Sequence, residues 1–159
     1  MVSVLFVCLG NICRSPTAEG VFTTLIVKEG LAGSVTIDSA GTGGYHIGDP
    51  PDQRAQAAAK KRGIDISDQR AREVRADDFD TFDYVIAMDD QNVRRLQRLC
   101  PQERLDRIHL FLNFAPGINA TEVPDPYYGE GDGFETVLDM IEAASGGLLA
   151  DIRSKHAIP

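Results

Sequence analysis

The chain has 159 residues, of which 43% are hydrophobic and 25% are charged, and its formal net charge is −8. This length suits one domain with a buried core, and the composition is that of a folded globular protein. The acidic balance argues against non-specific binding to nucleic acid or anionic lipid, because both need a basic surface. We therefore expect a single domain over residues 1–159, with no nucleic-acid partner and no membrane partner.

The expected compartment is the cytoplasm. The first apolar run, residues 2–9, is too short to span a bilayer, and it lacks the basic leader and cleavage site of a signal peptide. Three cysteines cannot form a full disulfide framework. Cys8 and Cys13 also lack the spacing of a structural zinc site, so we expect neither a metal nor a cofactor.

The first quarter of the chain predicts a strand, a helix and a second strand. Residues 2–8 are apolar almost throughout, which is typical of a strand buried on both faces. After a short loop, Ser15 is expected to cap a helix with Pro16 at its first position. Residues 35–39 then predict the second strand, and the glycine-rich residues 41–51 predict a surface loop.

The rest of the chain continues the alternation of helices and strands. The loop at residues 115–133 is predicted from its proline, glycine and acidic residues. The alternation indicates an α/β protein with a parallel sheet. The elements expected are a helix from the Asp52 cap to Gly63, a strand over 82–88, a helix capped by Asp89 or Asp90 and closed by Pro101, a strand over 108–112, and a helix over about 134–152 that Gly146 and Gly147 could kink.

The loop Cys8–Ser15, with the sequence CLGNICRS, joins the first strand to a helix N-terminus. Ligands bind in the crevice beyond the carboxyl ends of strands in such sheets, and inward-facing amides with the helix dipole favour an anion there. Gly10 and Asn11 tolerate the positive φ that a tight curl requires. Arg14 offers a planar fork of donors that matches two phosphoryl oxygens. The loop is therefore a candidate phosphate site.

Cys8 is the candidate nucleophile at the floor of this loop. A helix N-terminus and a nearby guanidinium favour the thiolate over the thiol, and the Ser15 hydroxyl could stabilise it further. The same field would therefore hold a phosphate and activate the sulfur beneath it. A lone Cys-x5-Arg pattern also fits a buried core cysteine, but the strand–loop–helix context favours the phosphate site.

Asp125 is the candidate general acid, because displacing a phenolic oxygen from phosphorus calls for a proton on the leaving group. Pro124 and Pro126 flank it and restrict its conformation. Tyr127 and Tyr128 follow and suit a flat aromatic substrate. Pro-Asp-Pro is equally good turn chemistry, so Asp125 could also simply cap a turn.

The sequence resembles the low-molecular-weight protein tyrosine phosphatases along essentially its whole length. The matching stretches are VLFVCLGNICRSP at 4–16, SAGT at 39–42, Met88-Asp89 before a helix, and VPDPYY at 123–128. The resemblance implies a single-domain three-layer α/β/α sandwich with four parallel strands. This chain departs from relatives in having Arg62 where they carry a histidine before the glycine.

The resemblance also implies how the site works. It assigns a phosphocysteine intermediate to Cys8, the phosphate clamp to Arg14, and the acid and then the base to Asp125. Asn11 and Ser39 would hold the loop in shape. The substrate-binding residues expected on this basis are Leu9, Gly10, Asn11, Ile12, Cys13, Ser15, Tyr45 and Tyr127.

Three further roles come from the resemblance alone. A reversible Cys8–Cys13 disulfide would protect the nucleophile from over-oxidation, although a small packing side chain explains Cys13 as well. Tyr127 and Tyr128 are possible phosphorylation sites. The expected partners are phosphotyrosine proteins and inorganic phosphate or related oxyanions, and the expected state is a monomer or a weak dimer.

Competing functions remain at this point. An arsenate reductase of this fold needs two further cysteines close together, and only Cys100 is available. Arginine phosphatases resemble this loop but carry threonine at the Ile12 position and lack the tyrosine pair. A phosphoprotein-binding module without catalysis would be expected to lack Cys8, Arg14 or Asp125, and all three are present.

Overall fold

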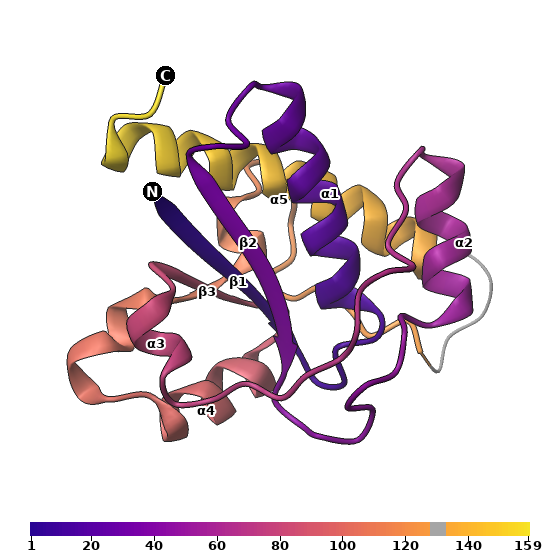
Figure 1. Cartoon of the computed structure of the whole chain (residues 1–159), viewed down its shortest axis with the longest axis horizontal. Helices are drawn as coiled ribbons and strands as arrows, with labels where there is room; N and C mark the ends of the chain where they lie inside the picture. Colours follow the sequence, from indigo (N-terminus) through magenta and orange to yellow (C-terminus); the bar gives the residue numbers. More distant parts are fainter. Residues whose placement is uncertain (128–132) are drawn as a thin grey trace.

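A parallel four-stranded sheet lies at the centre of the molecule (Figure 1). The computed structural model describes residues 1–127 and 133–159. All neighbouring strands are parallel, which confirms the predicted α/β class. The strands are β1 (Val2–Cys8), β2 (Val35–Gly41), β3 (Tyr84–Ala87) and β4 (Ile108–Leu110), in the order β2-β1-β3-β4. β1 is thus an inner strand, and the loop after it leaves from the middle of the sheet's carboxyl edge.

β1 is apolar at every position except the half-buried Ser3, because both of its faces are otherwise covered. Val4 and Phe6 face the larger hydrophobic core, whereas Leu5 and Val7 face a second core on the opposite side of the sheet. All four side chains are fully buried. Successive strand residues point to opposite faces, so a strand between two cores needs an apolar residue at every position. This packing fixes the point from which the Cys8 loop begins.

Helices cover both faces of the sheet, which gives three layers (Figure 1). One face carries α1 (Arg14–Lys28) and α5 (Gly133–His156), with α2 (Gln53–Lys61) packed beside them, and the other carries α3 (Asp78–Thr81) and α4 (Asp90–Leu99). Two 3-10 helices, η1 (Gln102–Arg107) and η2 (Phe111–Phe114), flank β4. Within the described residues, no helix combines the length and the apolar character that crossing a bilayer requires.

The predicted caps of α2 and α4 are confirmed. The Asp52 side chain accepts a hydrogen bond from the Arg54 amide, and Asp89 accepts one from the Asn92 amide at 2.8 Å. The Asp89 amide in turn donates to Asn92 Oδ1 at 3.2 Å, which completes a capping box. The start of α4 is therefore held firmly beside the carboxyl edge of the sheet.

The prediction that Ser15 caps the first helix is wrong. α1 begins two residues earlier than expected, at Arg14, and its N-cap residue Cys13 makes no side-chain capping bond. The Ser15 hydroxyl is engaged in the loop instead, where it lies 3.0 Å from Cys8 Sγ. The first amides of α1 thus have no side-chain cap, and they keep their capacity to bind an anion.

Several predicted element boundaries also change: β2 extends to Gly41, and β3 is limited to Tyr84–Ala87. β4 ends at Leu110 rather than at residue 112, because Phe111 and Leu112 are both buried in the same core. Adjacent strand residues would point to opposite faces, whereas the 3-10 turn of η2 brings both inward. α5 extends further than predicted, over Gly133–His156, and runs through Gly146 and Gly147 as one helix.

Candidate active site

The loop after β1 curls tightly beneath the carboxyl edge of the sheet. Asn11 takes the positive φ that the curl needs, at 57°, whereas Gly10, predicted as a second such position, does not have a positive φ. The segment after β2 lies alongside the loop, since the Thr42 amide donates to the Cys8 carbonyl at 2.9 Å. A Cβ on Gly41 would lie 2.7 Å from the Leu9 carbonyl oxygen, so this close approach requires glycine.

Asn11 organises the loop from behind. Its Nδ2 donates to Ser15 Oγ at 2.7 Å and to Ser39 Oγ at 3.0 Å, and its Oδ1 accepts from the Arg72 amide at 3.0 Å. Asn11, Ser15 and Ser39 are all buried. The loop-supporting side chains predicted for this site are therefore brought together, and the Arg72 amide completes the set.

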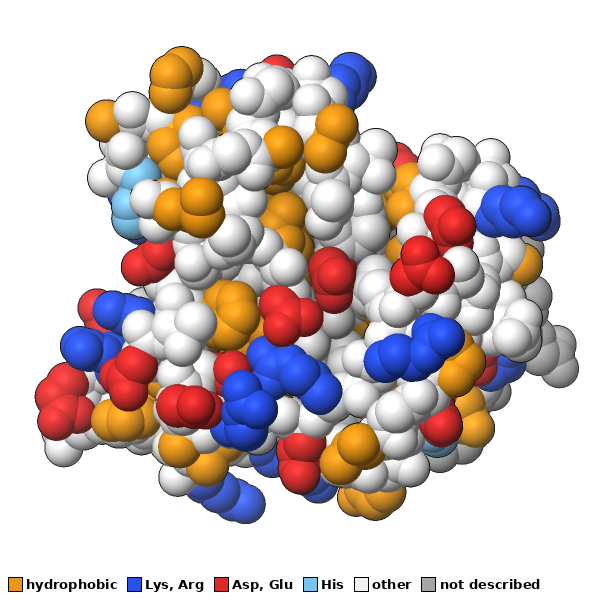
Figure 2. Space-filling view, in the orientation of Figure 1, with side chains coloured by type: hydrophobic (Ala, Val, Ile, Leu, Met, Phe, Trp, Pro, Cys, Tyr) orange, Lys and Arg blue, Asp and Glu red, His pale blue; other side chains and the backbone are white. Residues whose placement is uncertain are grey.

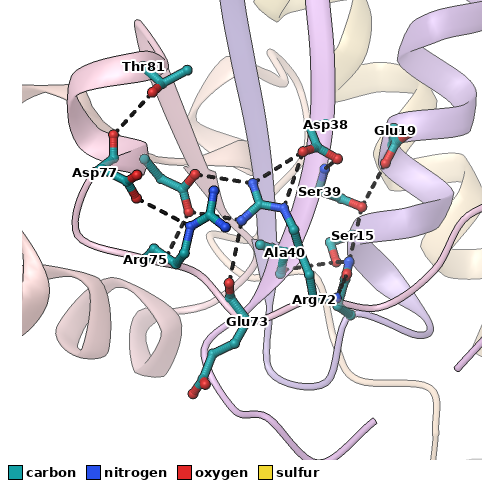
Figure 3. Close-up of polar contacts among 12 residues, drawn as sticks. Ser15, Glu19, Asp38, Ser39, Ala40, Arg72, Glu73, Arg75, Asp77 and Thr81 are labelled. Atoms are coloured by element: carbon teal, nitrogen blue, oxygen red, sulfur yellow. Dashed lines mark hydrogen bonds and ion pairs between the residues drawn. The ribbon is translucent and has the colours of Figure 1, made fainter. Parts of the chain in front are cut away.

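Glu19 sets the direction of these hydrogen bonds. The Ser39 hydroxyl donates to Glu19 Oε1 at 2.7 Å, across the space between β2 and α1 (Figure 3). Ser39 therefore donates its hydroxyl proton to Glu19 and accepts a hydrogen bond from the Asn11 amide. The second proton of that amide is donated to Ser15. The Ser15 hydroxyl is then left with its own proton to donate, and Cys8 Sγ at 3.0 Å is nearer than the Ala40 carbonyl at 3.4 Å.

Two arginines of the surrounding segments are anchored by carboxylates. Arg72, which supplies the amide to Asn11, pairs with Asp38 at 3.2 Å and Asp78 at 3.0 Å (Figure 3). Arg62, the residue before Gly63, pairs with Glu135 at 2.7 Å and Asp139 at 2.9 Å on α5. Arg62 thus ties α2 to α5 and takes no part in the Asn11 network.

Arg14 is held rigidly at the start of α1. Its Nη1 donates to Asp89 Oδ2 at 2.7 Å and to the Val123 carbonyl at 3.0 Å, and the side chain is only 3% exposed. Burial opposes its charge, but Cys8 and Asp89 outweigh burial and raise the pKa of Arg14 above its ordinary value. The guanidinium therefore stays charged and fixed, as a phosphate clamp must be.

Asp125 stands across the pocket from this guanidinium. Its Oδ2 lies 3.6 Å from Arg14 Nη2, and its Oδ1 accepts from the Tyr127 amide at 3.0 Å. The side chain is 35% exposed, so water reaches it as well. Asp125 therefore caps a turn, as one interpretation of Pro-Asp-Pro predicts, and it also faces the anion site, as a general acid would have to.

These side chains surround one pocket of about 360 Å³. Asn11, Ser15 and Ser39 lie behind it rather than on its wall, and Tyr128 lies outside the described residues. The predicted residues that line the pocket are Cys8, Leu9, Gly10, Ile12, Cys13, Arg14, Tyr45, Asp125 and Tyr127. Sulfur, guanidinium and carboxylate thus meet in a cavity with aromatic and aliphatic walls, which suits an aryl phosphate.

Three wall residues were not predicted from the sequence, namely His46, Gln91 and Arg95. His46 packs near Tyr127, with ring centroids 6.4 Å apart. Gln91 and Arg95 lie four residues apart on α4 and therefore share one helix face. Their spacing after the Asp89 cap was the available signal, since that cap sets α4 beside the sheet edge.

The three cysteines are free thiols. Burial, followed by the charges of Asp52 and Cys8, raises the pKa of Cys13 far above its ordinary value, which favours a neutral Cys13 thiol beside a charged Cys8. Cys100 lies half-buried at the end of α4, beside the second core. Residues 1–127 and 133–159 contain no cluster of His, Cys, Asp and Glu that could hold a metal ion.

A cysteine beneath an anion-binding loop, with an arginine and an opposed carboxylate, defines the class of cysteine-dependent phosphatases. The family model "Low molecular weight phosphotyrosine protein phosphatase" matches residues 3–157. The chain therefore belongs to this family.

Individual relatives agree along nearly the whole chain. The low molecular weight protein-tyrosine-phosphatase YfkJ of Bacillus subtilis is 43% identical over 99% of this chain and 100% of its own length. The human low molecular weight phosphotyrosine protein phosphatase is 46% identical over 85% of both chains. A crystal structure of protein tyrosine phosphatase from Entamoeba histolytica has a TM-score of 0.95 and 41% identity, covering 98% of this chain and 99% of that one.

Proposed function

We propose that this phosphatase removes phosphate from phosphotyrosine side chains of proteins in two steps, with Cys8 as nucleophile, Arg14 as clamp and Asp125 as acid and base. The observation that carries the proposal is the meeting of these three groups in one pocket, with Asp125 3.6 Å from Arg14 and Ser15 3.0 Å from Cys8. The catalytic domain proposed spans residues 1–159.

In the first step the Cys8 thiolate attacks phosphorus. A sulfur–phosphorus bond forms while the phosphorus–oxygen bond to tyrosine breaks, and Asp125 gives its proton to the departing oxygen. Arg14 and the amides of residues 9–15 hold the phosphoryl oxygens. Leu9, Tyr45 and Tyr127 flank the aromatic ring.

In the second step water releases the phosphate. Asp125, now ionised, takes a proton from the water as its oxygen attacks phosphorus, and the sulfur–phosphorus bond breaks. The electron pair returns to Cys8, where the Ser15 hydroxyl stabilises the thiolate. The partial exposure of Asp125 supports this second role, because water must reach the carboxylate.

An arginine phosphatase is the alternative with a structural neighbour in its favour. The crystal structure of DARP, a Drosophila arginine phosphatase, has a TM-score of 0.89 and 31% identity to this chain. The apolar Ile12 on the pocket wall and the tyrosine that follows Asp125 favour an aromatic ester instead. Turnover of a phosphotyrosine peptide far above that of a phosphoarginine peptide is expected, and the reverse order would favour the alternative.

Cys13 is the proposed redox partner of Cys8. After peroxide converts Cys8 to a sulfenic acid, the Cys13 thiol would attack that sulfur, forming a disulfide and releasing water. Both sulfurs lie on one pocket, and the charge of Cys8 acts on Cys13. Activity lost to mild peroxide should return on adding a dithiol, and equal recovery in Cys13→Ser would exclude the role.

The remaining proposals concern the compartment, the oligomeric state, the partners and the modification of the protein. We propose the cytoplasm as the compartment, because a thiolate nucleophile needs a reducing environment, and a monomer or weak dimer as the state. The partners proposed are phosphotyrosine proteins and inorganic oxyanions, without nucleic acid or membrane. Tyr127 remains a proposed phosphorylation site.

Two variants test the mechanism. Cys8→Ser should abolish turnover of p-nitrophenyl phosphate while tungstate still binds by calorimetry. Asp125→Ala should lower kcat by about 10²–10⁴-fold on phenyl phosphate, a poor leaving group, and much less on p-nitrophenyl phosphate. Substantial activity in Cys8→Ser, or equal losses on both substrates in Asp125→Ala, would contradict the assigned roles.

A further inference from the structure

The α4 wall of the pocket carries a guanidinium that the proposed chemistry does not use. Arg95 lines the pocket and is exposed to solvent. Across the described parts of the chain, 1–127 and 133–159, it makes no hydrogen bond or ion pair, whereas Arg14 and Arg54 are tied to Asp89 and Asp52. Arg95 is therefore available to a ligand in the pocket.

The position of Arg95 places it beyond the phosphate rather than on it. α4 is fixed at its start because Asp89 both caps the helix and binds Arg14. Arg95 follows Asp89 by six residues, which is about 9 Å along the helix axis at the usual rise per residue. The proposed phosphate site lies at the floor with Cys8 and Arg14, so Arg95 lies toward the mouth, where the residues next to a phosphotyrosine would pass.

The pocket wall opposite α4 does not offer a substrate carboxylate the same attraction. His46 lies there, with Asp49 at 3.3 Å from its Nδ1, and Asp49 is 58% exposed. A carboxylate at the mouth would thus be drawn to α4 and repelled from Asp49. A guanidinium is also the side chain best matched to a carboxylate, through two parallel hydrogen bonds.

We propose that Arg95 is a specificity-determining residue that selects phosphotyrosine sites with an aspartate or glutamate beside the phosphotyrosine. The inference rests on the proposed phosphotyrosine activity and adds the charge of the substrate sequence to it. The carboxylate pairs with Arg95 while the phosphate occupies the Cys8 loop. Because the pair is exposed, its effect should be modest and should shrink as salt is added.

The test uses phosphotyrosine peptides that differ only in a glutamate or glutamine, placed just before or just after the phosphotyrosine. The wild type should favour one glutamate peptide by roughly two- to fivefold in kcat/KM, the range of an exposed ion pair. Arg95→Gln should bring that ratio close to one, and Arg95→Glu should reverse it. Arg95→Gln should lower kcat/KM less on p-nitrophenyl phosphate than on the favoured glutamate peptide, because p-nitrophenyl phosphate has no flanking residue.

Arg94→Gln is the matched control, because Arg94 is an exposed arginine on the same helix that does not line the pocket. It should keep the wild-type preference. A glutamate preference that survives in Arg95→Gln, or an equal loss on every peptide, would overturn the inference. Failure of the wild type to act on any phosphotyrosine peptide would instead overturn the proposed function, so the two failures are distinguishable.

Discussion

At the scale of single residues, the site depends on where a few protons lie. Asn11 donates both protons of its amide to hydroxyls, and Ser39 can accept one only because its own proton goes to Glu19. The consequence reaches Cys8, since Ser15 is left with a proton directed at the sulfur. A carboxylate on α1 thereby orients the donor that stabilises the thiolate.

The same carboxylate should make stability depend on pH. Burial, reinforced by Asp38 and opposed by the Ser39 hydrogen bond and Arg72, raises the pKa of Glu19 from 4.5 to about 7. Between these values the folded protein holds a proton that the unfolded chain has released, so stability falls as pH rises through that window. Glu19→Gln keeps an acceptor for Ser39 but cannot ionise, and it should lose this decline.

Urea unfolding of both proteins from about pH 4.5 to about pH 7.5 measures the difference. The wild type should lose stability relative to Glu19→Gln as pH rises. Glu103→Gln, on the exposed surface of η1, is the control and should follow the wild type. Parallel pH curves for wild type and Glu19→Gln would show that Glu19 titrates normally.

At the scale of elements, α5 packs closely on η2 through a single glycine. A Cβ on Gly147 would collide with the carbonyl of Phe114 in η2, whereas a Cβ on Gly146 would meet nothing within 4 Å. The sequence suggested a kink at this glycine pair. Gly147 instead lets α5 pack on η2, whereas Gly146 lies on the surface with no neighbour that a side chain would meet.

This difference predicts opposite effects for the same substitution one residue apart. Gly147→Ala should destabilise the fold by about 1–3 kcal/mol, because α5 must move off η2. Gly146→Ala should stabilise it by about 1 kcal/mol, because alanine favours a helix interior over glycine. Chemical denaturation of both variants measures these changes in the free energy of unfolding. Equal effects of one sign would mean that α5 does not pack on Phe114 as described.

At the scale of the whole molecule, a net charge of −8 coexists with a cationic site. The face drawn in Figure 2 shows basic side chains interspersed with acidic ones and no continuous basic field. Arg14 is nearly buried and held by Asp89, so its charge is poorly screened by water and acts strongly on the pocket beside it. Phosphate binding therefore depends on local donors and not on the charge of the surface.

Much of this arrangement could be predicted from the sequence, because it is encoded in local patterns. The apolar run of β1, the aspartate caps of α2 and α4, and the Cys8–Ser15 loop each follow from neighbouring residues. Ser15 was expected both to cap α1 and to stabilise Cys8, and only the contact with Cys8 is found. The choice between the two could not be predicted, because the partners Asn11 and Cys8 compete with the helix only once the loop is folded.

The remaining features depend on contacts between distant segments. Glu19 meets Ser39 across the gap between α1 and β2, and the Arg72 amide reaches Asn11 from sixty-one residues away along the chain. Arg95 joins the pocket only because the sheet order places β3, and hence α4, next to β1. The Glu19–Ser39 and Arg72–Asn11 pairs leave no periodic or motif-like trace in a single sequence, and the one signal for Arg95 is its spacing after the Asp89 cap.

The most direct measurement is to trap the intermediate. Asp125→Ala mixed with p-nitrophenyl phosphate carrying labelled phosphorus should complete the first step, because that leaving group needs little protonation, and stall in the second, because no base activates water. After rapid denaturation and proteolysis, the label should lie on the peptide that contains Cys8. It should be absent from the double variant that carries both Asp125→Ala and Cys8→Ser. Label on any other residue, or label that persists without Cys8, would contradict the mechanism.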